Sequence, residues 1–310
     1  MRIIKKIYVF LLMFLIIIIT GCYNNKKTNE IIEVNGINYE LNSDNNAYLV
    51  TGYTSSIKEN VKLENEINNL PVIKVEDEAF ENCLSILKIT ITKNILEIGD
   101  SAFSNCWLLE EVIFEEYSAL EIIGENAFEK CLMLESIILP NKVKEIKNNS
   151  FYDCERLYSV SIPDSIEVIG NQVFYNCNLS YNIYEEVYYL GNSQNPYVFL
   201  TSCNKFEYFD FIVPEGTRII GSSAFKNQYI QKVTLSRSLY NIKQYAFAYC
   251  PVLEEIFIPG NVKLIGENAF NPTYKLKYIY LETNEIPSTF NHLWNNECNA
   301  QIILNYKPTN

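Results

Sequence analysis

The chain has 310 residues, enough for one large domain or two of ordinary size. Acidic residues outnumber basic ones by 37 to 25, so the net charge is −12, and 48% of the residues are hydrophobic. This charge argues against binding to nucleic acid, because affinity for a phosphate backbone comes from Lys and Arg side chains that displace counterions. The 23 Tyr and 17 Phe residues argue against a disordered chain and can supply a substantial core.

The chain begins with the pattern of an export signal. Arg2, Lys5 and Lys6 precede an apolar run from Ile7 to Thr20. As a helix, this run of 14 residues would span about 21 Å, which is short of the roughly 30 Å hydrocarbon core of a bilayer. A short apolar run behind basic residues is typical of a signal peptide rather than of a membrane span.

The run ends in Ile19, Thr20, Gly21 and Cys22, a tetrad that resembles the bacterial lipobox. The resemblance implies that the Cys22 thiol is alkylated by diacylglycerol and becomes the N-terminus of the mature protein. Two acyl chains give stable membrane anchoring, whereas one gives only marginal binding. We therefore expect a lipoprotein signal peptide at 1–21 and a polar tether at 22–30. The alternative is an ordinary secretory leader with a chance cysteine.

Phenylalanine recurs along the chain at a nearly constant spacing. Six of the seven steps between successive members are 22 to 25 residues long, and the remaining step is 51 residues. An Ile or Val stands five residues before each Phe, and Cys stands three residues after six of the eight. The eight members are Phe80, Phe103, Phe128, Phe151, Phe174, Phe225, Phe247 and Phe270. One such coil cannot bury its apolar residues alone, so the pattern predicts stacked repeats.

Between these Phe residues lies a segment with apolar side chains at relative positions 1, 4 and 6, as in Leu157, Val160 and Ile162. The last two positions alternate with a period of two, as a half-buried strand requires. Proline follows several of these segments, for example at Pro140 and Pro163, where loss of the amide donor ends strand pairing. Each coil is therefore predicted to contain a short parallel strand.

The repeated frame is Leu-x-x-Ile-x-Ile-Pro followed by Ile-Gly-x-x-Ala-Phe-x-x-Cys, as at 157–177. It resembles the BspA-like leucine-rich repeat over residues 70–281. The resemblance implies an exported bacterial surface protein of a family associated with adhesion to host proteins and surfaces. The predicted fold is mainly β: a leucine-rich-repeat or β-solenoid of about 23-residue coils with short parallel strands, capped at both ends.

The long step between Phe174 and Phe225 departs from the frame. Two apolar segments at 187–190 and 197–200 flank a polar turn at 191–196. This arrangement suggests a hairpin that projects from the stack, as part of an excursion at about 178–211.

The ends of the solenoid need covers, because an open coil would expose its core. Asn35 and Gly36 form a strong type I′ turn signal, so 31–69 is expected to be an N-terminal β-hairpin cap. Residues 282–310, with Pro287 and Trp294, are expected to cap the other end.

Eight cysteines remain besides Cys22, and six of them fall in the repeat: Cys83, Cys106, Cys131, Cys154, Cys177 and Cys250. An even number permits a disulfide framework. However, side chains in one repeat column would point together into the core as small apolar residues, so we expect buried free thiols. No Cys-x-x-Cys pair is present, which argues against a structural zinc site.

Little in the sequence indicates catalysis. The single histidine, His292, has no surrounding motif of the kind that orients a catalytic base. Pairs such as Glu110 with Glu111 and Glu254 with Glu255 are more typical of a solvated surface than of an acid–base pair. No nucleotide-binding or metalloprotease motif is present, so no catalytic residue, cofactor or metal is predicted.

The outward residue between the last two buried strand positions is apolar or aromatic in four of seven coils: Ile113, Ile138, Phe257 and Tyr280. Exposed apolar side chains often mark interaction sites, although short strands also favour such residues for their own sake. The excursion adds four tyrosines, namely Tyr184, Tyr188, Tyr189 and Tyr197. These eight residues form the predicted ligand face.

Three functions are compatible with this pattern. The first is a lipid-anchored adhesion or protein-binding module on the outer bacterial surface, whose partner is a host matrix or surface protein. The second is an envelope lipoprotein that binds glycans by stacking them on exposed tyrosines. The third is an enzyme with a site in 178–211. The first is preferred, with diacylglyceryl Cys22 as the membrane contact.

Overall fold

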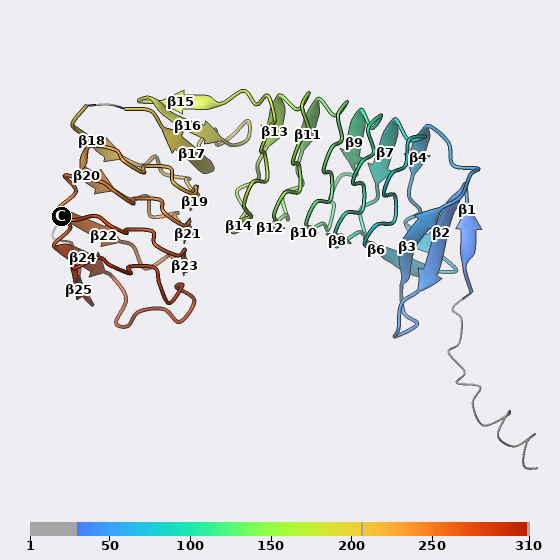
Figure 1. The fold of residues 1–310 in the computed structure, drawn as a ribbon. Coiled ribbons are helices and arrows are strands. Elements are labelled where there is room, and N and C mark those ends of the chain that lie inside the picture. The colour runs from blue at the N-terminus through green and yellow to red at the C-terminus, as the bar shows by residue number, and fades with distance from the viewer. Residues whose placement is uncertain (1–29, 206, 309–310) are drawn as a thin grey trace, which may run out of the picture.

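The computed structural model describes residues 30–205 and 207–308, in which strands and turns alternate and no helix occurs. The predicted all-β solenoid is confirmed. Figure 1 shows two stacks of coils that meet at an angle near the middle of the chain. We call residues 30–177 the first module and residues 178–308 the second module. The lipobox cysteine, Cys22, lies outside the described residues.

Each coil of the first module contributes a longer strand to one side of the stack and a short strand to the other. The longer strands are β4 (Asn60–Lys62), β7 (Lys88–Ile91), β9 (Glu111–Phe114), β11 (Ser136–Ile138) and β13 (Ser159–Ser161). The short-strand side contains β6 (Leu70–Val75), β8 (Glu97–Ile98), β10 (Ile122–Ile123), β12 (Glu145–Ile146) and β14 (Val168–Ile169), with β5 (Glu66–Ile67) paired to β6. Successive coils pair in parallel, as the repeat predicts.

The second module repeats this plan. Its longer strands are β18 (Phe209–Ile212), β20 (Ile230–Thr234), β22 (Glu255–Ile258), β24 (Tyr278–Leu281) and β25 (Gln301–Ile303). Its short strands are β19 (Ile219–Ile220), β21 (Asn241–Ile242) and β23 (Leu264–Ile265). Near its end, Phe290 and Trp294 are buried, and the Trp294 ring meets Phe270 edge-on with 5.9 Å between centroids.

The repeated phenylalanines form two ladders inside the stacks. Neighbouring rings are nearly parallel, with centroids 5.0 to 5.7 Å apart, from Phe80 to Phe174 and again from Phe225 to Phe270. All but Phe174 are fully buried. Truncation of a buried Phe to Ala costs about 3–5 kcal/mol, so these rings are the main internal support of each stack.

The cysteine column has a specific hydrogen-bonding role. The thiols of Cys106, Cys131, Cys154 and Cys250 are buried, and each donates to the backbone carbonyl of the Phe one coil earlier. Thr273 stands in the same column and donates its hydroxyl to the carbonyl of Phe247 at 2.8 Å. The eight described cysteines are free thiols; five of the six repeat cysteines are buried, as expected, whereas Cys177 is half-buried. Burial holds the pKa of Cys131 well above its ordinary value.

The open start of the first module is covered by a three-stranded antiparallel cap, the first cap, formed by β1 (Ile32–Val34), β2 (Ile37–Leu41) and β3 (Tyr48–Tyr53). The hairpin turns at Asn35 and Gly36, whose φ angles are 54° and 84°. A type I′ turn requires positive φ at both positions. Strand β3 then pairs in parallel with β6 and so starts the short-strand sheet.

The excursion at 178–211 does not project from the stack, in contrast to the expectation from sequence. It forms a second cap with β15 (Asn182–Tyr184), β16 (Val187–Leu190) and β17 (Phe199–Cys203), which are antiparallel to one another, and β17 pairs in parallel with β19. Its register reproduces that of the first cap 150 residues earlier, including a bulge at the same place. The chain therefore contains two modules, each with its own cap.

The outer face of the second cap closes the end of the first module. Leu190, Val198, Phe199 and Ile219 are buried and belong to the apolar core of the first module. The second module also supplies hydrogen-bond donors to carbonyl groups around β14, the last short strand of the first stack. Arg218 Nε donates to the carbonyl of Ile166, and the side-chain amide of Asn241 donates to that of Glu167.

A third junction donor is Lys243, whose ammonium group donates to the carbonyl of Gly170. In a continued stack, backbone amides of the next coil would pair along this edge. The side chains of the second module therefore replace part of a missing coil. In the described part of the chain, no helix has the length and apolar character needed to cross a bilayer.

Candidate functional site

The outward column of the longer strands lies where the sequence places it. The parallel register aligns Thr90 with Ile113, Ile138 with Ser161 and Phe257 with Tyr280. Ile113 is half-buried, whereas Ile138 is 75% exposed. The two residues differ in exposure because β9 and β11 do not pair: the sheet of longer strands is interrupted between them.

The interruption follows from the length of one coil. The step from Phe103 to Phe128 is 25 residues, and the two additional residues fall between the half-buried Phe114 and the buried Leu120. The enlarged loop carries Tyr117, which has φ 60° and is 89% exposed. Two additional residues thus place a bare aromatic ring beside the outward column.

Tyr117 and Ile138 line the same hollow, whose volume is about 610 Å³. Phe114, Leu139 and Pro140 contribute further apolar walls. Apolar surface of this kind loses water favourably when a partner covers it, and aromatic side chains in pockets are typical interface hot spots. We call Phe114, Tyr117 and Ile138 the Tyr117 patch.

One edge of the hollow is fixed by Glu115. Its carboxylate lies 2.7 Å from the Lys62 ammonium and accepts hydrogen bonds from the Lys93 amide and the Asn65 side chain. The hydrogen bond from Lys62 is the main reason that the Glu115 pKa lies below its ordinary value. These contacts connect the enlarged loop to two earlier coils and hold the residue next to the Tyr117 patch in place.

The outward column of the second module is aromatic but partly covered by its own chain. The ring of Tyr306 lies 6.0 Å from that of Phe257 and 4.3 Å from that of Tyr280, and both predicted residues are half-buried. The Arg237 guanidinium lies over Phe257 at 5.3 Å and is held by Glu282 through bonds of 2.8 and 2.7 Å. Nevertheless, Tyr278 remains 39% exposed beside Tyr280.

The tyrosines of the second cap do not form one exposed face. Tyr189 is completely buried, so the prediction that it belongs to a ligand face was wrong. Its hydroxyl has no hydrogen-bond partner in the part of the chain that the structure describes, and burial raises its pKa far above the ordinary value. Tyr184 and Tyr197 are half-buried and pack against each other at 5.7 Å, while Tyr188 is half-buried against Tyr181.

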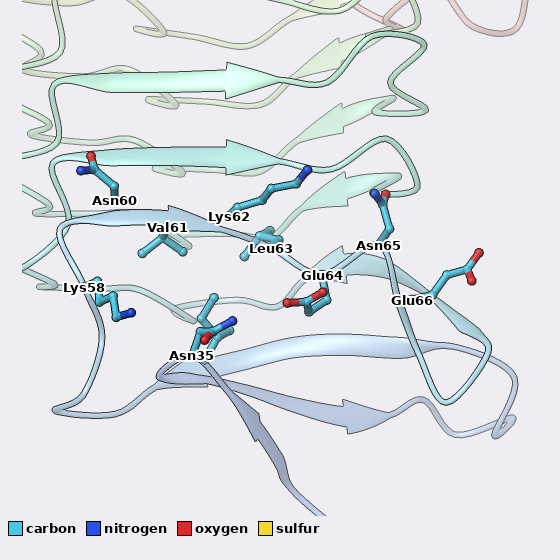
Figure 2. Close-up of a pocket in the computed structure, with 10 residues that line it drawn as sticks. Asn35, Lys58, Asn60, Val61, Lys62, Leu63, Glu64, Asn65 and Glu66 are labelled. Atoms are coloured by element: carbon cyan, nitrogen blue, oxygen red, sulfur yellow. The ribbon is translucent and has the colours of Figure 1, made fainter.

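A second hollow lies at the start of the first module, between β4 and the hairpin of the first cap. Figure 2 shows Asn35 and Glu64 in this space, with Lys58 and Asn60 at its rim. Its volume is about 620 Å³. Among the described residues, no strand pairs with the outer edge of β4. That edge offers backbone donors and acceptors to an extended chain.

Within residues 30–205 and 207–308, no three His, Cys, Asp or Glu side chains gather closely enough to hold a metal ion. His292 is exposed in the C-terminal region. What the arrangement provides is apolar and aromatic surface for binding.

Sequence reasoning missed three exposed or aromatic members of this surface: Tyr117, Ile212 and Tyr306. The 25-residue step was a usable signal for Tyr117, because a longer coil must enlarge a loop. Ile212 is 65% exposed and is the partner of Thr234 in the outward column. Ile212 could not be assigned to the outward column because the sequence did not show where the second module begins. Tyr306 lies outside the periodic pattern and has no sequence signal.

These features define a leucine-rich-repeat solenoid that presents apolar side chains from an outward strand face. The family model described as BspA type leucine rich repeat region, with six copies, matches residues 73–195 and 192–303. The chain belongs to this family. The two matched stretches meet at the second cap, where the structure divides the modules.

Solved structures with a similar fold include a leucine-rich repeat protein of T. pallidum, at 22% identity and a TM-score of 0.47, covering 80% of this chain and 91% of that one. A leucine-rich cell surface protein of Faecalibacterium prausnitzii A2-165 has 20% identity and a TM-score of 0.40, with 90% and 96% covered. The pneumococcal vaccine antigen PcpA has 19% identity and a TM-score of 0.43, with 91% and 89% covered. A comparison with curated proteins gives no match.

Proposed function

We propose that this chain is a lipid-anchored binding module of the outer bacterial surface, that it recognises a protein partner and that it performs no catalysis. The observation that carries the proposal is the Tyr117 patch, where an 89% exposed Tyr and a 75% exposed Ile flank one hollow. Membership of the BspA type family supports a surface-exposed binding role. The role of adhesion and the class of partner belong to the proposal.

The chemistry of the patch fits a protein partner. Exposed apolar patches rimmed by polar residues often mark protein interaction sites. Glu115, Glu116 and Lys142 surround the apolar centre, and a polar rim around an apolar core is the usual anatomy of a protein interface. The partner is therefore expected to insert an apolar or aromatic side chain into the hollow.

The test is binding of the wild-type chain and of a Tyr117→Ser/Ile138→Ser variant to purified host matrix proteins and bacterial surface proteins. Affinity for a captured partner should fall by at least about thirtyfold, which corresponds to about 2 kcal/mol. Tyr274→Ser is a matched control, because Tyr274 is 84% exposed but lies away from the patch. Unchanged affinity in the double variant would remove the patch from the interface.

Membrane anchoring is tested separately. The proposal rests on the tetrad that ends at Cys22, so Cys22→Ser should abolish incorporation of labelled fatty acid and leave the protein unprocessed or released. Label that persists on the Cys22→Ser protein would contradict the anchor without affecting the binding proposal.

A second candidate is a glycan partner, which the exposed ring of Tyr278 beside Tyr280 and Tyr306 favours. Aromatic rings provide flat apolar surfaces on which sugars can stack. A glycan array would distinguish the two, because saturable hits that are lost in Tyr278→Ala but kept in Tyr117→Ser/Ile138→Ser would favour the glycan.

A further inference from the structure

A cavity of about 240 Å³ lies at the junction of the two modules. Three parts of the chain form it: the last coil of the first module, the second cap, and the first two coils of the second module. Phe174, Tyr181, Leu190 and Phe199 supply apolar and aromatic walls. The cavity therefore exists only because the second cap joins the two stacks.

Lys243 brings a positive charge into this apolar cavity. Its side chain is largely buried, and its ammonium group donates to the carbonyl of Gly170. None of the residues that line the cavity is an Asp or a Glu. Burial alone lowers the pKa of Lys243 to about 8, with no nearby carboxylate to raise it. At neutral pH the cavity thus holds a cation whose other N–H groups remain available.

The repeat contains a matched lysine with a different environment. Lys147 stands at the same position of its coil, directly after the buried Ile of the short strand. Its ammonium group lies 3.2 Å from the Asp100 carboxylate. A lysine at this position of the frame therefore pairs with a carboxylate where one is present. Among the described residues, no carboxylate pairs with Lys243.

A second polar group points to the same ligand chemistry. The hydroxyl of Ser222, which also lines the cavity, is buried and has no hydrogen-bond partner within residues 30–205 and 207–308. A buried hydroxyl without a hydrogen bond destabilises the fold, so such groups are rare unless a ligand or water completes them. An oxyanion would accept from Ser222 as well as from Lys243.

We propose that the junction cavity is a binding site for a small carboxylate with an apolar body, in which the carboxylate pairs with Lys243 and Ser222 and the body packs against Phe174 and Phe199. The volume supports this size, because an apolar protein cavity of about 150 Å³ already accommodates benzene. The carboxylate could belong to a free small molecule or to the C-terminus of a peptide with an apolar last residue. This site is separate from the Tyr117 patch.

The experiment is titration calorimetry of 3-phenylpropionate into the full chain in lipid nanodiscs, with empty nanodiscs as the partition control. Saturable one-to-one binding is expected. The neutral amide, 3-phenylpropionamide, should bind at least tenfold more weakly, because it lacks the charge that pairs with Lys243. Equal affinity for acid and amide, or no saturable heat above the empty nanodiscs, would overturn the proposal.

Matched variants locate the site. Lys243→Met should weaken binding of 3-phenylpropionate at least tenfold, and Ser222→Ala should weaken it several-fold, whereas Lys147→Met should leave it unchanged. Undiminished binding in both Lys243→Met and Ser222→Ala would overturn the assignment. The comparison of acid with amide uses the unmodified chain, so it can still overturn the proposal if a variant fails to fold.

The source of the carboxylate is decided with N-acetyl-Gly-Phe and its C-terminal amide. Binding of the free acid of this peptide, competing with 3-phenylpropionate, would support the site and assign it to peptide C-termini. Binding of 3-phenylpropionate alone would support the site and assign it to free small carboxylates.

Discussion

The two caps share one backbone but perform different tasks. In both, the hairpin register, the bulge and the parallel exit into the short-strand sheet are the same. The outward positions differ: the first cap has Glu40 and Leu49 where the second has Leu190 and Phe199. Leu190 and Phe199 are buried against the first module. The apolar outer face of the second cap therefore packs on the first module, so this cap joins the two modules.

The inner faces of the caps also differ, in a compensating way. Tyr53 of the first cap stacks on Phe80 at 6.0 Å, whereas the second cap has Cys203 at that place. There the aromatic neighbour of the first ladder ring is Phe211 on β18, which lies 5.7 Å from Phe225. The comparison teaches that the register is the same in both caps, whereas the strand that supplies the aromatic ring differs.

The largest effect is expected from the ladders. Phe128→Ala and Phe247→Ala each remove a ring stacked on both sides and should cost about 3–5 kcal/mol. Hydrogen exchange should then distinguish the modules. Phe128→Ala should accelerate exchange in the first module only, because the second has its own cap. Phe247→Ala should also expose β14, because the second cap covers that end. Uniform loss of protection in both variants would mean that the chain is one cooperative unit.

The turn of the first cap should be the next most sensitive position. Gly36 has φ 84°, and a Cβ at this residue would lie 2.6 Å from the backbone of Ile57. Gly36→Ala should therefore lower the free energy of unfolding by about 2–3 kcal/mol in urea titrations. The control is Gly52→Ala, where an added Cβ meets nothing closer than 3.8 Å. Equal midpoints for the two variants would show that the first cap contributes little to stability.

The junction lysine predicts a pH dependence that the first module lacks. The Lys243 pKa is lowered from 10.5 to about 8 in the folded chain. Between these values the unfolded chain binds the additional proton, so stability should rise with pH in this window and the gain should be lost below about pH 8. A Lys243→Met variant lacks this ammonium group but keeps every other side chain around the cavity.

Urea titrations at pH 7.5 and 9.5 measure this difference. Relative to Lys243→Met, the wild-type chain should gain about 1–2 kcal/mol at the higher pH, which is less than the full shift of the pKa implies because these two pH values cover only part of the interval from about 8 to 10.5. Identical pH profiles would show that the ammonium group is solvated. Relative to Lys147→Met, which lacks the pair with Asp100, the wild-type chain should show no such gain, because both chains contain Lys243.

The smallest effect concerns the turn of the second cap. Glu185 and Glu186 adopt φ values of 48° and 66°, which Asn and Gly tolerate better. Replacement of the pair by Asn and Gly, as in the first cap, should raise the free energy of unfolding of the second module by about 1 kcal/mol. A lower melting temperature in this variant would show that the glutamate side chains stabilise the turn by contacts of their own.

Sequence alone predicted the coil, its strands and its inward residues well. Each depends on neighbours within one repeat: Leu157, Val160 and Ile162 are all buried, as their spacing predicts. The outward residues Ile113 and Ile138 were also found, because a strand alternates its two faces. Tyr189 was misplaced since its cap was not recognised. Glu185 and Glu186 give no turn signal, so the register that buries Tyr189 could not be read.

The sequence by itself determined a chain of about 23-residue coils with an apolar interior, because the spacing of Phe, Ile and Cys sets which side chains face inward. Only the tertiary structure decided that the stack is interrupted and turned by a second cap. Contacts such as that of Lys243 with Gly170, 73 residues apart, depend on how one module rests on the other. No local periodicity encodes that rotation, since it results from the packing of Leu190, Phe199 and Ile219 against an open end.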